Sequence, residues 1–131
     1  MIKEQRCQTV MELFSRYRDL KLRDKRKGSS LRFFLYMTRE MKESSVDVLE
    51  LSIRSLNVLK RAGFFTIGDV VYAIADGLSI NSLRNCGSKS AREIMEHLFL
   101  YQYYQLPVEK RDDYIYEVTV LNCYDKGIQD G

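Results

Sequence analysis

The chain has 131 residues, of which 45% are hydrophobic and 11% aromatic, and its formal net charge is +3 at pH 7. This size suits one compact domain with extensions, and the apolar content suffices for a buried core. No apolar run approaches the roughly 20 residues that span a membrane, and the charged N-terminus lacks a signal-peptide core, so we expect a cytoplasmic protein without membrane contact. Cys7, Cys86 and Cys123 are odd in number and far apart, which predicts reduced thiols and neither a disulfide framework nor a zinc site. We expect no metal and no cofactor.

The N-terminal extension, residues 1–45, is basic and is expected to be helical. Residues 1–43 hold 12 Lys and Arg against 6 Asp and Glu. Apolar side chains recur at helical spacing over residues 10–20, and Ser29 and Ser30 can cap a second helix over Leu31–Glu43. The sequence therefore predicts two helices, joined by a basic turn that ends at Gly28.

The central segment, residues 46–106, is predicted to be a set of short helices separated by tight turns. Ser52 can cap a helix that closes at Ala62 and Gly63, and Thr66 can start a second one that ends at Asp76 and Gly77. A single turn follows, and a last helix begins near Ser88. Within that helix, residues 90–93 have the pattern of a capping box.

The C-terminal extension, residues 107–131, is acidic. Pro107 either stops the preceding helix or opens the next one as a first-turn proline. The apolar positions after Val108 allow a helix that ends at Lys126 and Gly127, whereas Tyr114–Leu121 is also rich in β-forming residues and could be an edge strand. We favour the helix, and the whole pattern then predicts an all-α fold.

Two features of the central segment can bind phosphate. A glycine at position 87 lets a ligand approach the backbone closely, and the first amides of the helix that follows have no intrahelical acceptor. The helix dipole adds partial positive charge there, beside Lys89 and Ser90. Arg54 and Asn57 lie three residues apart and therefore share one helix face. Taken singly, each of these residues is better explained as an ordinary surface residue or turn former.

Three ordered segments decide between these interpretations. They are an Arg-Ser-x-Asn-x-Leu-Lys-Arg run from Arg54, a Thr-x-Gly-Asp turn from Thr66, and an Arg-Asn-x-Gly-x-Lys-Ser-x-x-Glu-Ile run from Arg84. Together they resemble the C-terminal domain of the bacterial RNA polymerase alpha subunit, a compact bundle of short helices with helix-hairpin-helix units. The alpha subunit also has a large assembly domain, so we expect this protein to be a short stand-alone one that carries only the DNA-binding domain.

The resemblance implies a bacterial transcription protein that binds A·T-rich double-stranded DNA through the minor groove. A narrow A·T groove has an enhanced negative potential that attracts an inserted arginine, which Arg54 would supply. Glu93 is expected to orient its neighbours, since a carboxylate facing phosphate is repulsive. The implied DNA-binding residues are Arg54, Asn57, Asn85, Gly87, Lys89, Ser90 and Glu93.

The basic run of residues 16–27 is by itself most simply a solvated turn. Beside a DNA-binding domain it also offers sequence-independent phosphate contacts. The candidates are Lys21, Arg23, Lys25, Arg26 and Lys27.

Two other functions compete with DNA binding. Glu50 retains an acidic residue that faces sigma factor in the resembled family, so the alternative is a module that engages sigma factor, activators or RNA polymerase itself. A DNA-repair enzyme is the third class, because helix-hairpin-helix units also occur in such enzymes. We expect no catalysis, because His97 is the sole histidine and no lysine–aspartate or carboxylate cluster lies near the glycine turn.

Overall fold

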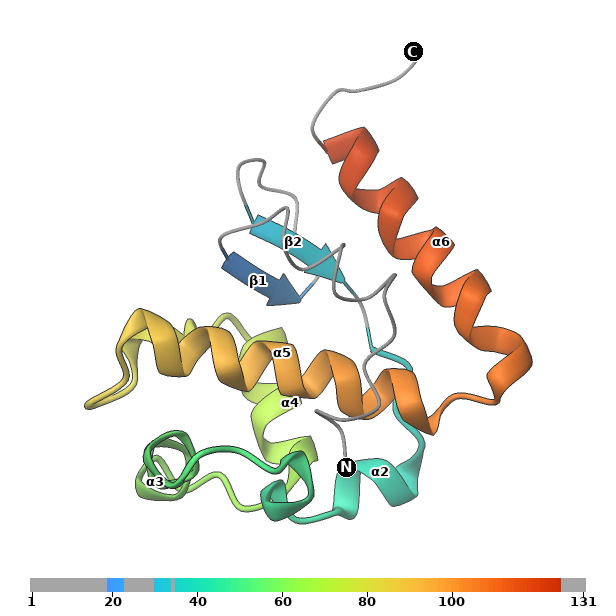
Figure 1. Ribbon diagram of the computed structural model, residues 1–131. Coiled ribbons are helices and arrows are strands. Elements are labelled where there is room, and N and C mark those ends of the chain that lie inside the picture. The colour runs from blue at the N-terminus through green and yellow to red at the C-terminus, as the bar shows by residue number, and fades with distance from the viewer. Residues whose placement is uncertain (1–18, 23–29, 34, 126–131) are drawn as a thin grey trace. The chain divides into compact units, whose positions relative to one another are not determined.

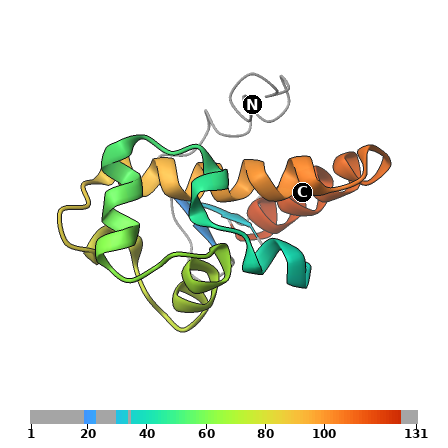
Figure 2. The same cartoon turned by 90° about the horizontal axis from the view of Figure 1, so that it is seen from below.

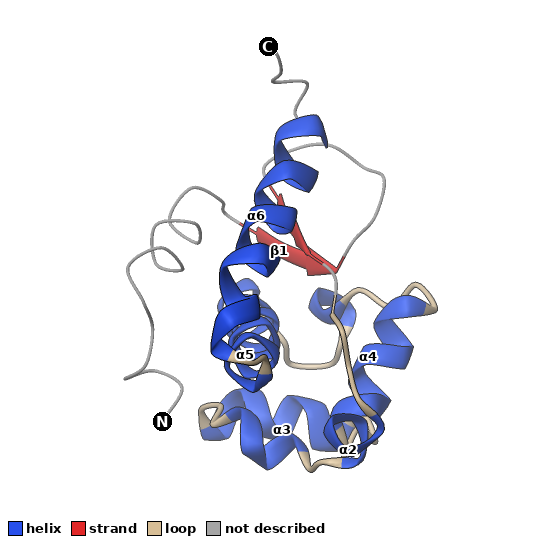
Figure 3. Ribbon diagram, turned by 90° about the vertical axis from the view of Figure 1, so that its right-hand side faces the viewer, coloured by secondary structure: helices blue, strands red, loops and turns tan. Residues whose placement is uncertain are grey.

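The computed structural model describes residues 19–22, 30–33 and 35–125, and these are mostly helical (Figures 1 and 3). The chain divides into two compact units. One consists of Tyr36–Leu98, and the other combines the chain before Tyr36 with the chain from Phe99 onward. The all-α class is confirmed for the domain, and one pair of short strands in the second unit departs from it.

The unit Tyr36–Leu98 is built from short helices, as the turn and cap residues predict. Ser52 caps α3 and Thr66 caps α4, where Asp69 completes a capping box. Gly63 and Gly77, which follow these two helices, have φ of 87° and 110°, in the left-handed region that glycine adopts without strain. The elements are α2 (Arg39–Glu43), η2 (Val46–Leu49), α3 (Ile53–Arg61), α4 (Ile67–Ala75), η3 (Ile80–Ser82) and the first part of α5 (Ser88–Gln105).

The core of this unit lies between α3, α4 and the first part of α5, which Figure 2 shows from below. Leu49, Leu59, Ile67 and Ile94 are completely buried there. The segment before α4 is tied to η2 by backbone hydrogen bonds, from Val46 N–H to the Phe65 carbonyl and from Ile67 N–H to the Ser44 carbonyl. The helices are thus held by apolar burial and by bonds between their connecting segments.

His97 belongs to this core and is 1% exposed. Its Nδ1 lies 2.6 Å from the carbonyl oxygen of Leu49. A carbonyl can only accept, so the ring nitrogen donates this bond. The sequence-based interpretation of His97 as a core or helix-surface residue is consistent with this position.

The other unit contains two parallel strands, the end of α5, and α6. β1 (Asp19–Leu22) pairs with β2 (Ser30–Phe33), with Leu20 opposite Leu31. Phe33 meets the ring of Phe99 edge to face, at 5.1 Å between centroids, and Tyr114 of α6 (Val108–Asp125) lies 5.5 Å from the same ring. These aromatic contacts stabilise the tyrosine-rich C-terminal part of α5, which remains helical as far as Gln105.

The helix predicted over Leu31–Glu43 is wrong. Residues 30–33 form β2, and helical structure begins only at Arg39. Alternation of apolar side chains at Leu31 and Phe33, together with pairing to a distant strand, prevails over the helical spacing. The N-terminal helix over residues 10–20 lies outside the described residues except for its end, where β1 begins.

The helix predicted after Pro107 is confirmed. α6 runs from Val108 to Asp125, and Tyr114–Leu121 lies inside it. Tyr114, Ile115 and Val118 are buried on one face. Their spacing of one, three and four residues is helical, which explains why the local β propensity does not prevail.

Candidate nucleic-acid interface

One face of α3 carries the polar residues expected to bind DNA. Arg54 and Asn57 are both exposed, and Arg61 continues the same face one turn further on. Together with Val58 of α3 and with Asn85 from the turn before α5, they line a hollow of about 370 Å³. Two segments separated by more than twenty residues therefore meet around a surface with two arginines and two amides.

The turn that leads into α5 brings Asn85 and Gly87 to this region. Asn85 adopts a left-handed conformation with φ of 61°, which asparagine tolerates better than most residues. The Gly87 carbonyl accepts the Ala91 N–H at 3.0 Å, so Gly87 lies directly before the first turn of α5. A Cβ built on Gly87 meets no atom within 4 Å, and its φ lies outside the left-handed region. The fold therefore does not require glycine at this position.

Glu93 ties the start of α3 to α5. Its carboxylate accepts the Ser52 N–H and the Ser52 hydroxyl, each at 2.9 Å, and also the buried Ser55 hydroxyl. The capping box predicted within residues 90–93 is wrong, because α5 already begins at Ser88 and Glu93 caps a different helix. Glu93 therefore orients α3, the role suggested for it on electrostatic grounds.

The charge of Glu93 is stabilised in this position. Partial burial raises the pKa of the carboxyl, but hydrogen bonds from Ser55 and Ser52, with a smaller contribution from His97, outweigh it. The pKa of Glu93 consequently lies below its ordinary value, so the carboxylate remains ionised near neutral pH.

The remaining expected residues differ in accessibility. Lys89 is exposed in the first turn of α5, whereas Ser90 is only 7% exposed and faces the interior. Glu50 is half-exposed, with φ of 55° at the end of η2. Of the candidate phosphate contacts in the extension, the side chain of Lys21 and all of residues 23–27 lie outside the described structure.

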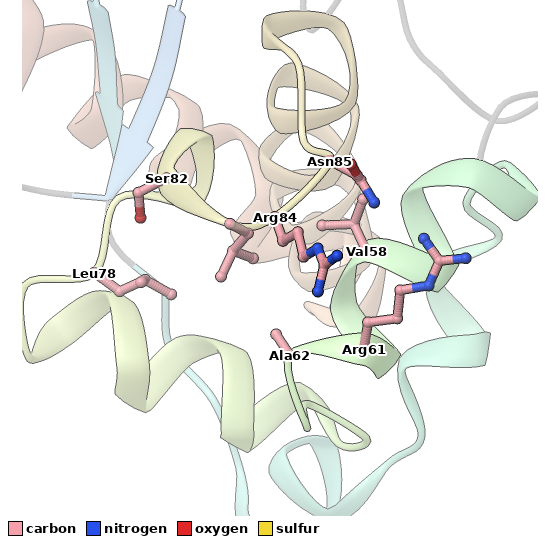
Figure 4. A pocket seen from close by; sticks show the side chains of 8 residues that line it. Val58, Arg61, Ala62, Leu78, Ser82, Arg84 and Asn85 are labelled. Carbon is pink, nitrogen blue, oxygen red and sulfur yellow. The ribbon is translucent and has the colours of Figure 1, made fainter.

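Sequence reasoning missed Arg61 and Arg84. They line a second hollow, of about 740 Å³, whose wall includes Ala62 and Leu78 (Figure 4). Val58, Arg61 and Asn85 border both hollows. The sequence does contain a signal for Arg61, because Arg54, Asn57 and Arg61 are spaced by three and four residues and therefore share one helix face. Arg84 had no such signal, since its position depends on how the turn packs against α3.

The described residues contain no group of three or more His, Cys, Asp and Glu side chains that could hold a metal ion. Nor does the described part of the chain include a helix with the length and hydropathy needed to cross a membrane.

Comparison with known proteins finds a family model that matches the central unit. Residues 37–99 match the family model that describes the C-terminal domain of the bacterial RNA polymerase alpha subunit. No solved structure matches the chain significantly.

Similar curated proteins include alpha subunits of DNA-directed RNA polymerase. The one from Mesomycoplasma hyopneumoniae is 42% identical over 59 residues, covering 45% of this chain and 17% of the relative. The one from Malacoplasma penetrans is 36% identical over 89 residues, covering 68% of this chain and 24% of the relative. The one from Borreliella burgdorferi is 40% identical over 70 residues, covering 53% of this chain and 20% of the relative. The match thus spans less than a quarter of each of these relatives.

Proposed function

We propose that this protein acts in transcription by binding DNA, because residues 37–99 match the family model of the bacterial RNA polymerase alpha C-terminal domain. It binds A·T-rich double-stranded DNA through the minor groove and the phosphate backbone, without catalysis. The observation that carries this proposal is the convergence of Arg54, Asn57 and Asn85 around one exposed hollow.

The chemistry of these side chains suits a minor groove. The guanidinium of Arg54 is attracted by the negative potential of a narrow A·T groove. The amide groups of Asn57 and Asn85 can donate to the base acceptors and sugar oxygens that line it. Because the groove presents a degenerate acceptor pattern, these contacts distinguish A·T from G·C pairs and little more.

Beside the groove, the Gly87 turn supplies phosphate contacts. The first amides of α5 point away from the helix, and Lys89 adds a positive charge in the same turn. Glu93 does not oppose the phosphates, because its carboxylate is occupied by Ser52 and Ser55.

The proposal is tested by titrating the full-length protein with A·T-rich and G·C-rich duplexes of equal length at several salt concentrations. We expect tighter binding to the A·T-rich duplex and an affinity that falls with salt. Equal affinity for both duplexes would contradict the minor-groove assignment, and no binding to either would contradict the function as a whole.

Replacing Gly87 by Ala is expected to weaken binding to both duplexes by about tenfold or more while leaving the thermal stability unchanged. The added Cβ meets nothing within 4 Å in the free protein, but it occupies the space through which a phosphate reaches the first amides of α5. Anisotropy titrations give the affinity and thermal unfolding gives the stability. A variant that loses stability would show that Gly87 serves the fold, and one that binds DNA as the wild type does would show that no phosphate approaches the backbone at Gly87.

A second candidate function is binding to the polymerase machinery. The observation that favours it is the exposed surface around η2, where Val48 is 40% exposed and Glu50 is half-exposed. Direct binding of the full-length protein to purified sigma factor, lost in a Glu50→Lys variant that still folds, would support this role. Sigma-factor binding that persists in that variant would exclude the Glu50 surface.

A further inference from the structure

Two arginines outside the expected DNA-binding set lie together at the C-terminal end of α3. Arg61 is the last residue of the helix, and Arg84 lines the same hollow from the turn before α5. Figure 4 shows the Arg84 side chain beside Val58, with Asn85 above it, while the Arg61 side chain extends outward from the end of α3. Glu93 contacts Ser52 and Ser55 at the opposite end of α3. Arg61 thus lies at the end of α3 away from these serines, and Arg84 lies in the turn that also holds Gly87.

The lysines and arginines of the unit Tyr36–Leu98 divide into those that have an interaction partner and those that form no ion pair. Arg39 pairs with Glu43 and Lys60 pairs with Asp47, each at 3.2 Å, while Lys42 lies 5.4 Å from the centre of the Tyr72 ring. Arg92 also has a partner. Among the residues that the structure describes, no carboxylate forms an ion pair with the four remaining cations, which are Arg54, Arg61, Arg84 and Lys89.

The unpaired cations concentrate on one surface. No acidic residue lines either of the two hollows around α3. Arginines gathered without counter-charges repel one another, and that repulsion is relieved when an anion binds between them. A polyanion is therefore the ligand that this surface favours.

The spacing fits an extended polyanion better than a single ion. Arg54 and Arg61 are seven residues apart on one helix, which places them about 10 Å apart along its axis. Phosphates of one DNA strand advance about 3.4 Å along the duplex per base. With Arg54 in the groove, Arg61 can therefore reach a phosphate about three base steps away.

The hollow beside Arg61 and Arg84 also has apolar walls, formed by Val58, Ala62, Leu78 and Leu83. A cationic rim around an apolar floor complements a sugar–phosphate unit, whose phosphate binds guanidinium and whose deoxyribose packs on carbon. We propose that Arg61 and Arg84 bind the DNA backbone at the C-terminal end of α3, as phosphate contacts additional to those of Lys89 and the first amides of α5. This inference depends on the DNA-binding function proposed above.

The test compares the full-length wild type with the double variant Arg61→Gln, Arg84→Gln, which keeps the aliphatic stems and removes both charges. We expect the salt slope of log K to become shallower by about two, so that a fourfold rise in salt weakens the wild type about 12-fold more than the variant. The ratio of A·T-rich to G·C-rich affinity should not change, since backbone contacts carry no sequence information.

Lys60→Gln is the matched control. It removes one positive charge from the same helix, but Lys60 pairs with Asp47 and lines neither hollow. We expect it to keep the wild-type salt slope. The Arg61→Lys, Arg84→Lys variant should restore most of the slope, and circular dichroism verifies that each variant is folded.

Three results would overturn the inference. A double Gln variant with wild-type slope and affinity would show that the two arginines do not contact DNA, although the function proposed above would stand. A decrease in salt slope for Lys60→Gln as large as that of the double Gln variant would show a general effect of net charge. Absence of wild-type binding to either duplex would overturn this inference together with the proposed function.

Discussion

Replacing Arg54 by Ala is expected to abolish most of the preference for A·T-rich over G·C-rich duplex, at a cost of about 1–3 kcal/mol of binding free energy on the A·T-rich site. Arg54 is exposed and forms no ion pair with a described carboxylate, so its guanidinium is available to enter the groove. The interaction depends on groove width and potential, which differ between the two duplexes. Fluorescence anisotropy on both duplexes measures the change.

Arg39→Ala is the control for this substitution. Arg39 is an exposed arginine of α2 that pairs with Glu43 and lies outside both hollows. We expect it to leave the A·T preference intact. If Arg54→Ala weakened binding to both duplexes equally, Arg54 would be a backbone contact and another residue would carry the preference.

Replacing Glu93 by Ala is expected to destabilise the fold by about 2–4 kcal/mol near neutral pH, because two serines and one backbone N–H lose their acceptor. Ser55 is completely buried, so its hydroxyl finds no water in exchange. Urea unfolding followed by circular dichroism measures the loss. Glu43→Ala removes an exposed carboxylate of a surface pair and should cost far less.

The effect of Glu93→Ala should also depend on pH. The pKa of Glu93 lies below its ordinary 4.5, so the folded protein binds fewer protons at this site than the unfolded chain. Its stabilising contribution is complete above that ordinary value and is lost as the pH falls through the lowered pKa. The stability difference between wild type and variant should therefore shrink on acidification. A difference that is constant with pH would mean that the ionised form is not specially stabilised.

Local signals in the sequence predicted the central unit well. Ser52 and Thr66 cap the helices that they were expected to cap. Such caps act over three residues, so the information is present in the local sequence. The faces of α3 and α6 were also predictable, because helical periodicity fixes which side chains share a side.

The errors arose where distant residues decide the structure. Glu93 fits a local capping box by spacing, yet it caps α3 from a position 38 to 41 residues away from its serine partners. Residues 31–33 fit the spacing of a helix but pair with β1. Arg84 lies beside Arg61 only because its turn packs against the end of α3. No local pattern encodes these three contacts.

Glu93 and His97 lie one turn apart on α5, and between them they hold both sides of the segment that carries Arg54. His97 bonds the Leu49 carbonyl before it, and Glu93 bonds Ser52 and Ser55 around it. The backbone under Arg54 is thereby fixed before any ligand arrives, so binding has to order only the arginine side chain. Affinity gained in this way comes from preorganisation and not from additional contacts.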